Sequence, residues 1–257
     1  KDTEVNNQRL TRGLWVLACV AIAITLLLVL QVWRRLRETS QLLQNSQARL
    51  KVQSERDPLT GLANRRHFQN VMRREAGSHG FTGALMMIDI DHFKAINDRH
   101  GHAAGDRVLA ELARRVAGSV RAQDLVARWG GEEFLVLAPH LDGGAARALA
   151  QRLLQALSGE PVLLEQGESL RVSASIGHAV FPLAPHHVQL SPDQAINLAD
   201  MALYLAKSQG RNRAVGIEHA DAADAAGLRA LESDFERAAT EGRVLLCVDL
   251  GVPTAVA

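Results

Sequence analysis

A pair of glycines followed by a pair of glutamates stands near the middle of the chain, where residues 128–134 read RWGGEEF between the apolar runs LVA and FLVL. Short β-prone runs joined by Gly-Gly are typical of a β-hairpin, because glycine enters the φ > 0 conformations of a tight primed turn without steric cost. Glu132 and Glu133 are therefore expected at or next to the hairpin tip. Glycine also lets a ligand contact the backbone, and a carboxylate beside it can hold a hard cation such as Mg²⁺. An ordinary solvated turn has the same residues, so this stretch alone leaves both interpretations open.

A second acidic strand end lies upstream, where the apolar run 84–91 finishes in Asp-Ile-Asp. Its near-continuous hydrophobicity predicts a strand buried on both faces, with a polar end as its wet part. A strand-terminal aspartate is often only a helix cap. Two strand ends that carry Asp89 and Glu132 can, however, converge on one cation, and this pairing favours a nucleotide and metal site.

The sequence resembles the GGDEF-domain diguanylate cyclases, in the variant that reads GGEEF, from about Asp57 to Ile217. Seven separate motifs carry the resemblance in the family's order, and they begin at Asp57 (DPLTGLANRR), Asp89 (DIDHFKAIND), Gly101 (GHAAGD), Arg121 (RAQD), Arg128 (RWGGEEF), Ser175 (SIGHAV) and Ala199 (ADMALYLAKSQGRNR). The resemblance implies an α+β nucleotidyl-cyclase fold akin to the polymerase palm, with a mainly antiparallel central sheet flanked by helices. It also implies an enzyme that condenses two GTP into cyclic di-GMP and two pyrophosphates, as a homodimer inhibited by its product.

The resemblance further implies roles for individual residues. Two Mg²⁺ or Mn²⁺ ions per active site would be held by Asp89, the Ile90 carbonyl, Glu132 and Glu133, and the three carboxylates would be catalytic. Substrate-binding positions would be His92, Phe93, Lys94, Asn97, Asp106, Gly130, Gly131, Lys207 and Arg211. The product-inhibition site would contain Arg121, Asp124 and Arg128.

Simpler interpretations of these residues stay open. Asn97 and Asp106 suit guanine, because an aspartate can accept hydrogen bonds from its N1–H and its amine. Asparagine and aspartate are, however, also common in turn sequences. Lys207 and Arg211 can offset the charge of a triphosphate or simply favour a helix dipole. Arg121 and Asp124 can form an ordinary surface ion pair.

The segment before the cyclase-like region is divided by composition. Residues 1–13 are expected to be extracytoplasmic and residues 14–33 to form a transmembrane helix, because about 20 nearly unbroken apolar residues match a hydrocarbon core of roughly 30 Å. Residues 34–56 contain leucines spaced by seven, and this spacing predicts a signalling helix or a weak coiled coil. The expected location is the cytoplasmic membrane, with the catalytic domain, residues 57–218, in the cytoplasm. Residues 219–257 are expected to form a helical extension of unknown role.

Composition excludes several classes of function. The net charge of +1 gives no reason to expect a nucleic-acid partner, and the two cysteines, Cys19 and Cys247, do not suggest a disulfide framework. Two alternatives to a diguanylate cyclase remain. One is a non-catalytic receptor that binds cyclic di-GMP at Arg121 and Asp124, and the other is an adenylyl-type cyclase with the same fold. The intact Gly-Gly-acid turn argues against the receptor, and Asn97 with Asp106 argues against adenine.

Overall fold

The computed structural model describes Trp15 and residues 30–35, 37, 55–77, 80–164 and 167–252. It divides the chain into two compact units, residues 1–54 and 55–257. The described residues of the first unit are helical. Most of the predicted coiled coil, residues 34–56, lies outside the described residues.

The prediction of a single-pass location in the cytoplasmic membrane is contradicted. Among the described residues, no helix combines the length and the apolar character needed to span a bilayer. Most of the predicted span, residues 14–33, lies outside this described set, which includes only Trp15 and residues 30–33 of it. The prediction relied on hydropathy and on flanking charge, which report composition and not the extent of a helix.

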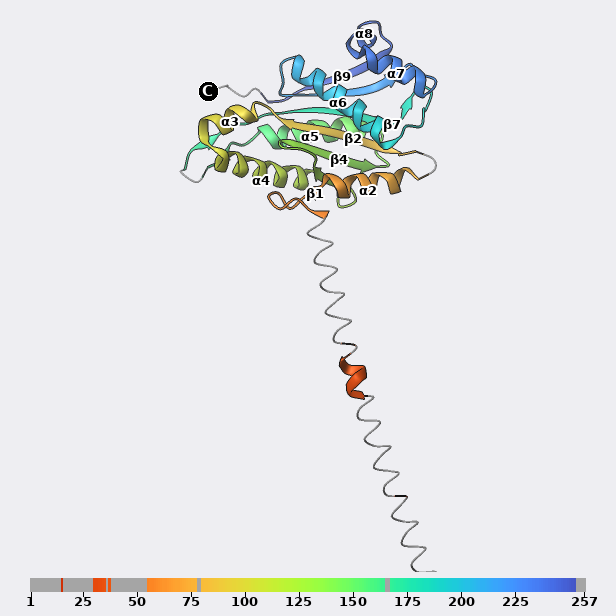
Figure 1. Ribbon diagram of the computed structural model, residues 1–257. Helices are drawn as coiled ribbons and strands as arrows, with labels where there is room; N and C mark the ends of the chain where they lie inside the picture. The colour runs from red at the N-terminus through yellow and green to blue at the C-terminus, as the bar shows by residue number, and fades with distance from the viewer. Residues whose placement is uncertain are drawn as a thin grey trace, which may run out of the picture. The chain divides into compact units, whose positions relative to one another are not determined.

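A seven-stranded sheet forms the centre of the second unit, with the strand order β1-β3-β4-β2-β7-β8-β9 (Figure 1). Its strands are β1 (Ala63–Asn64), β2 (Gly83–Ile90), β3 (Leu125–Arg128), β4 (Glu133–Pro139), β7 (Ala174–Ala184), β8 (Arg213–Ala220) and β9 (Val244–Leu250). β2 is antiparallel to both of its neighbours, β4 and β7, whereas β7 and β8 are parallel. The short strands β5 (Val162–Leu163) and β6 (Ser169–Leu170) pair separately. The predicted α+β sheet is confirmed.

Helices precede, connect and follow these strands, and several begin where the sequence offers a cap. They are α2 (Arg65–Ala76), α3 (Phe93–His100), α4 (His102–Ser119), α5 (Gly143–Ser158), α6 (Pro192–Ser208), α7 (Ala225–Ser233) and α8 (Phe235–Thr240). Asn64 accepts a hydrogen bond from the His67 amide at 3.0 Å, and Ser191 forms a capping box with Gln194. Each of these side chains satisfies a backbone amide at a helix start that has no intrahelical partner. α4 begins at His102, directly after Gly101.

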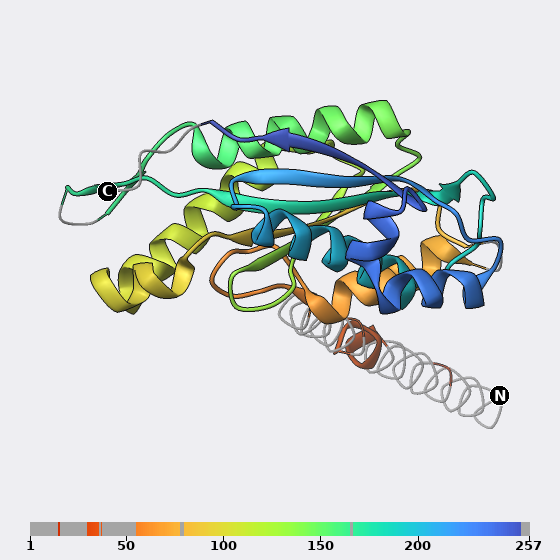
Figure 2. The same cartoon turned by 90° about the horizontal axis from the view of Figure 1, so that it is seen from above.

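The sheet is covered on both faces, which produces two apolar cores. Leu85 and Met87 of β2 belong to the core that includes α2 and α6, whereas Met86 and Ile88 belong to the core that includes α4 and α5. Figure 2 shows α5 and α6 on opposite sides of the sheet. Because successive strand side chains point to opposite faces, every residue of β2 is buried. The polar ends of the strands are the part of the sheet left to meet a ligand.

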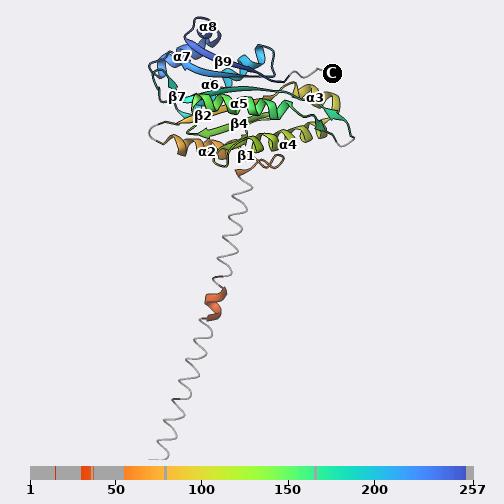
Figure 3. The same ribbon diagram turned by 180° about the vertical axis from the view of Figure 1, so that it is seen from behind.

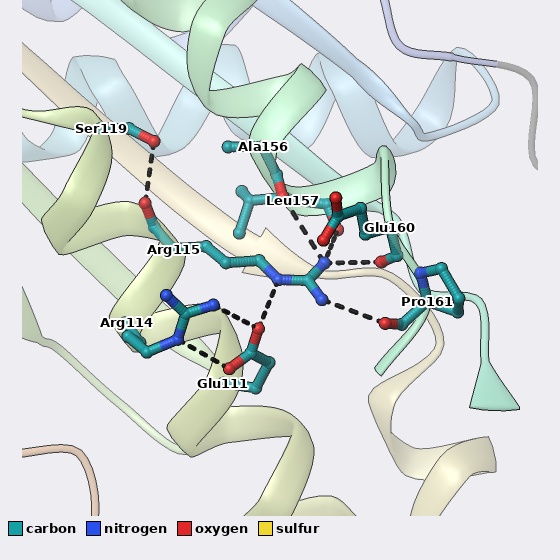
Figure 4. Close-up of polar contacts among 8 residues, drawn as sticks. All are labelled: Glu111, Arg114, Arg115, Ser119, Ala156, Leu157, Glu160 and Pro161. Carbon is teal, nitrogen blue, oxygen red and sulfur yellow. Dashed lines mark hydrogen bonds and ion pairs between the residues drawn. The ribbon is translucent and has the colours of Figure 1, made fainter. Parts of the chain in front are cut away.

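Two arginines join the C-terminal ends of α4 and α5, which pack against each other (Figure 3). The Arg115 guanidinium donates to the carbonyls of Ala156 and Leu157 in the last turn of α5 and to those of Glu160 and Pro161 just beyond it, as Figure 4 shows. In return, Nε of Arg152 donates to the carbonyl of Ser119 at 2.9 Å. Each helix thereby satisfies carbonyl groups that the other helix leaves without an intrahelical partner.

The C-terminal extension is only partly helical. α7 and α8 are short, and β9 then pairs antiparallel with β8 at one edge of the sheet. The ion pair between Arg147 of α5 and Asp249 of β9, at 2.9 Å, fastens this strand. The expected helical extension is thus corrected for residues 244–250, a mostly apolar run whose valines and leucines suit a strand.

Candidate active site

The predicted hairpin is confirmed, and its tip carries the two glutamates. The amide of Trp129 donates to the carbonyl of Glu133 at 2.8 Å and closes the turn between β3 and β4. The expected primed turn is wrong, however, because neither Gly130 nor Gly131 has a positive φ. A Cβ at Gly130 would lie 2.5 Å from Oε2 of Glu133. Glycine at this position therefore leaves room for the carboxylate.

Asp89 lies beside this tip because β2 and β4 pair in register. Its Cα partner on β4 is Glu133, and the amide of Ile90 donates to the carbonyl of Glu132 at 3.4 Å. Asp89 itself is 7% exposed. The structure therefore brings together the two acidic strand ends that the sequence predicted would converge.

Lys207, in the last turn of α6, supplies the counter-charge to this acidic end. Its Nζ lies 2.8 Å from Oδ2 of Asp89. Burial raises the pKa of Asp89, Lys207 lowers it, and the charges of Glu132 and Glu133 raise it. The net result of these effects is a pKa of about 6. The three carboxylates are thus close enough to interact electrostatically, and together they favour a cation.

The donor set fits a hard divalent cation by its chemistry, since carboxylate and carbonyl oxygens are the ligands that Mg²⁺ prefers. Among residues 55–77, 80–164 and 167–252, however, no three His, Cys, Asp or Glu side chains are arranged to hold one metal ion together. Lys207 instead contacts one oxygen of the Asp89 carboxylate.

A second feature of the site is the start of α3, which directly follows β2. His92 adopts a left-handed conformation with φ of 56°, and no side chain in the described part of the chain caps the helix. The first amides of α3 are therefore free to meet an anion. Lys94 is exposed in the first turn, whereas Phe93 is buried and anchors the helix. The phosphate-binding role of residues 92–94 stays a prediction.

The two predicted guanine-reading residues lie on α3 and α4. The side chain of Asn97 packs directly over Gly105, where any Cβ would overlap its Oδ1. Asp106 follows Gly105 and is exposed. The glycine thus lets α3 approach α4 closely enough for an amide and a carboxylate to lie at the same helix junction.

The predicted inhibitory residues form a tight turn before β3. The Arg121 amide donates to Oδ2 of Asp124 at 2.8 Å, and Oδ1 of Asp124 is buried without a partner within the described part of the chain. Arg121 is exposed, and no ion pair joins it to Asp124 among these residues. Arg128, in contrast, donates to the Gly131 carbonyl and pairs with Asp57 at 3.3 Å. Its guanidinium therefore supports the hairpin turn and the start of the domain.

Sequence reasoning gave no role to Asp91 or Asn212, although the structure ties them together near the site. Oδ2 of Asp91 accepts a hydrogen bond from the backbone amide of Asn212 at 3.0 Å. The second aspartate of Asp-Ile-Asp was the signal in the sequence, but nothing in the pattern indicates that its partner lies 121 positions away.

Comparison with known proteins identifies the family. The protein-family model described as diguanylate cyclase, GGDEF domain, matches residues 54–213, which are more than half of the chain. The chain belongs to this GGDEF family. Diguanylate cyclase TpbB of Pseudomonas aeruginosa is 42% identical over 173 residues, covering 66% of this chain and 39% of that protein. The chain therefore spans well under half the length of this curated relative.

Two solved structures show the same fold as this GGDEF domain. Diguanylate cyclase SiaD of P. aeruginosa, in complex with its activator SiaC, is 35% identical with a TM-score of 0.60, covering 81% of this chain and 79% of SiaD. The coiled coil and GGDEF domain of DgcB of Caulobacter crescentus, in complex with c-di-GMP, is 28% identical with a TM-score of 0.65, covering 72% of this chain and 98% of that one.

Proposed function

We propose that the chain is a diguanylate cyclase, which condenses two GTP into cyclic di-GMP and two pyrophosphates. The observation that carries this proposal is the convergence of Asp89, Glu132, Glu133 and Lys207 at one end of β2, beside an uncapped helix start. Membership of the GGDEF family supports the same reaction.

The acidic strand ends would hold divalent metal ions, Mg²⁺ or Mn²⁺. Asp89, the Ile90 carbonyl, Glu132 and Glu133 would be the ligands, once Lys207 turns from Asp89 toward the triphosphate. A bound ion would lower the pKa of a hydroxyl and neutralise charge on phosphate oxygens.

The chain's own groups would bind and orient GTP. The amides of 92–94, together with Lys207 and Arg211, would hold the phosphates, and Gly130 and Gly131 would let the nucleotide contact the hairpin backbone. Asn97 would donate to O6 of guanine, and Asp106 would accept from its N1–H and amine. These contacts favour GTP over ATP.

Two subunits, each holding one GTP, would then face each other. The 3′-oxygen of one GTP forms a bond to the α-phosphorus of the other, the bond to pyrophosphate breaks, and the hydroxyl proton passes to a base. Glu133 would serve either as this proton acceptor or as a ligand of the second metal. A second transfer in the opposite direction closes the ring. Positioning and electrostatic stabilisation supply most of the barrier reduction in this type of reaction.

Product would be bound at Arg121 and Asp124. The exposed guanidinium of Arg121 can stack on guanine or pair with phosphate, and Oδ1 of Asp124 is a buried acceptor without a partner among the described residues. The same observation favours a second candidate function, a receptor that binds cyclic di-GMP without making it.

The test is incubation of the purified chain with GTP and Mg²⁺, with nucleotides separated by chromatography and identified by mass. The enzyme is expected to yield cyclic di-GMP and pyrophosphate in a ratio of about 1:2, and ATP is expected to yield no cyclic dinucleotide. A folded, dimeric chain that binds cyclic di-GMP but forms none from GTP would overturn the enzyme proposal and establish the receptor.

A further inference from the structure

Asp91 lies two residues beyond Asp89, but its carboxylate is already engaged by the protein. Oδ1 accepts from the Ser175 hydroxyl at 2.6 Å, and Oδ2 accepts from the Ser173 hydroxyl at 2.7 Å and the Asn212 amide at 3.0 Å. Asp91 is 4% exposed. A buried carboxylate with both oxygens occupied by protein donors is poorly suited to be a metal ligand.

The segment that Asp91 contacts has an unusual backbone. Arg211 and Asn212 are consecutive non-glycine residues with φ of 61° and 46°. This conformation is unfavourable for residues with a Cβ and persists only where the surroundings impose it. Strain of this kind at a residue predicted to bind phosphate points to a positioned segment and not to an ordinary loop.

Hydrogen bonds on three sides impose this conformation. The Arg211 amide donates to the Ala206 carbonyl at 3.0 Å, and the Asn212 amide donates to Asp91. From β9, the Gly251 amide donates to the Asn212 carbonyl at 2.8 Å, and Nδ2 of Asn212 donates to the Val252 carbonyl at 2.8 Å. Asn212 thus connects β2, the segment after α6 and the C-terminal extension.

Two links therefore join the end of β2 to the end of α6. Lys207 contacts Asp89, and Asn212 contacts Asp91. The first link carries the charged groups of the site. The second is buried, and it fixes the backbone of Arg211, which lies between Lys207 and Asn212 in the chain.

We propose that Asp91 and Asn212 are positioning residues that hold Arg211 toward the triphosphate of GTP. This inference rests on the proposed function, since it concerns the same substrate. Asp91 acts through the backbone of Asn212, and the bound nucleotide would meet only the Arg211 guanidinium.

The test compares two substitutions of Asp91. Asp91→Asn keeps an oxygen that can accept from the backbone amide of Asn212, and its side-chain NH2 group can donate to a serine hydroxyl. Nucleotide affinity is therefore expected to stay within about threefold of wild type. Asp91→Ala removes every acceptor and is expected to weaken binding of a non-hydrolysable GTP analogue about tenfold. Circular dichroism and thermal melting check that each variant is folded.

A double-mutant cycle with Arg211→Ala separates positioning from a general loss of stability. In the Arg211→Ala background, Asp91→Ala is expected to change analogue affinity by less than about twofold, because the residue that it positions is gone. If Asp91→Ala does not fold, the double substitution Ser173→Ala and Ser175→Ala removes the hydroxyls that orient the carboxylate. It is expected to weaken binding in the same Arg211-dependent way.

Two results would overturn the proposal. One is a loss of binding in Asp91→Asn as large as in Asp91→Ala, which would indicate a role for the negative charge. The other is a tenfold effect that persists in full without Arg211. Because analogue binding is measured independently of turnover, failure of the chain to make cyclic di-GMP would contradict the proposed function and leave this inference standing.

Discussion

Nζ of Lys207 lies 2.8 Å from Oδ2 of Asp89, which places a cation from the end of α6 against the acidic end of β2. Burial, Glu132 and Glu133 all raise the pKa of Asp89, whereas Lys207 lowers it, and the outcome is a pKa of about 6. Lys207 therefore partly offsets the negative charge of these three carboxylates. A substrate that brings both phosphates and metal would redistribute these contacts.

Lys207→Ala is expected to raise the KM for GTP at least about tenfold, because a phosphate loses a charge-assisted contact. Lys207→Arg keeps a cation and is expected to lose less. Steady-state kinetics with both variants measures this difference. Arg74→Ala, which removes an exposed cation at the end of α2, is the matched control and should behave as wild type. Equal KM values for wild type and Lys207→Ala would contradict the assignment.

Glu132→Gln is expected to lower kcat at least about a hundredfold, because the exchange removes a charge that would hold the metal while preserving the size of the side chain. Glu132 is half-buried at the hairpin tip and glutamine has nearly its size, so the thermal midpoint is expected to stay close to that of wild type. Glu236→Gln on α8 is the control, since it alters an exposed glutamate away from the hairpin. Retained turnover in Glu132→Gln would show that this carboxylate is not required.

Arg121→Ala is expected to weaken product inhibition at least about tenfold without changing the initial rate, because the guanidinium is exposed and Arg121 lies before β3, outside the hairpin tip that carries Glu132 and Glu133. The measurement is the initial rate over a series of added cyclic di-GMP concentrations. Arg229→Ala, at an exposed position of α7, should leave the inhibition constant unchanged. Unaltered inhibition in Arg121→Ala would place the product elsewhere.

Arg115→Ala is expected to lower the free energy of unfolding by about 1–3 kcal/mol, because four carbonyls in and just beyond the last turn of α5 lose a charged donor (Figure 4). The Arg115 side chain is 8% exposed, so water replaces it poorly. Denaturant unfolding measures the change. Arg114→Ala, whose side chain is 72% exposed, is the control and is expected to unfold with an unchanged midpoint. A stable Arg115→Ala variant would mean that water satisfies these carbonyls.

His178 predicts a pH dependence of stability. Burial lowers the pKa of His178 from 6.5 to about 4, so the unfolded chain binds more protons than the folded chain between these values. Stability from the neutral imidazole is therefore complete above pH 6.5 and is lost as the pH falls through about 4. The loss is expected to approach about 3 kcal/mol, since each pKa unit corresponds to about 1.4 kcal/mol.

Denaturant unfolding from pH 7 to pH 4 tests this dependence. His178→Phe removes the titrating ring and should flatten the curve in that range. His219→Phe, at an exposed position of β8, should leave the curve as in wild type. An unchanged slope in His178→Phe would assign the acid sensitivity to other groups.

Local features of the fold were predictable from the sequence because short-range chemistry determines them. Asn64 and Ser191 cap helices through amides three residues away, and the apolar run of β2 is buried wherever that strand lies. The hairpin was also predictable, although its glycines serve the Glu133 carboxylate and not a positive φ. The predicted membrane location failed, because composition alone does not establish a helix.

The sequence by itself thus determined the hairpin, the caps, the buried central strand and the residue types of the site. Only the tertiary structure decided that Lys207 pairs with Asp89, that Asn212 contacts Asp91 and that β9 joins the edge of the sheet. The physical reason is that strand register and helix packing bring together groups that are far apart in the sequence, more than a hundred residues for the contacts of Lys207 and Asn212. Those arrangements depend on the burial of two whole apolar cores, which no local stretch of sequence contains.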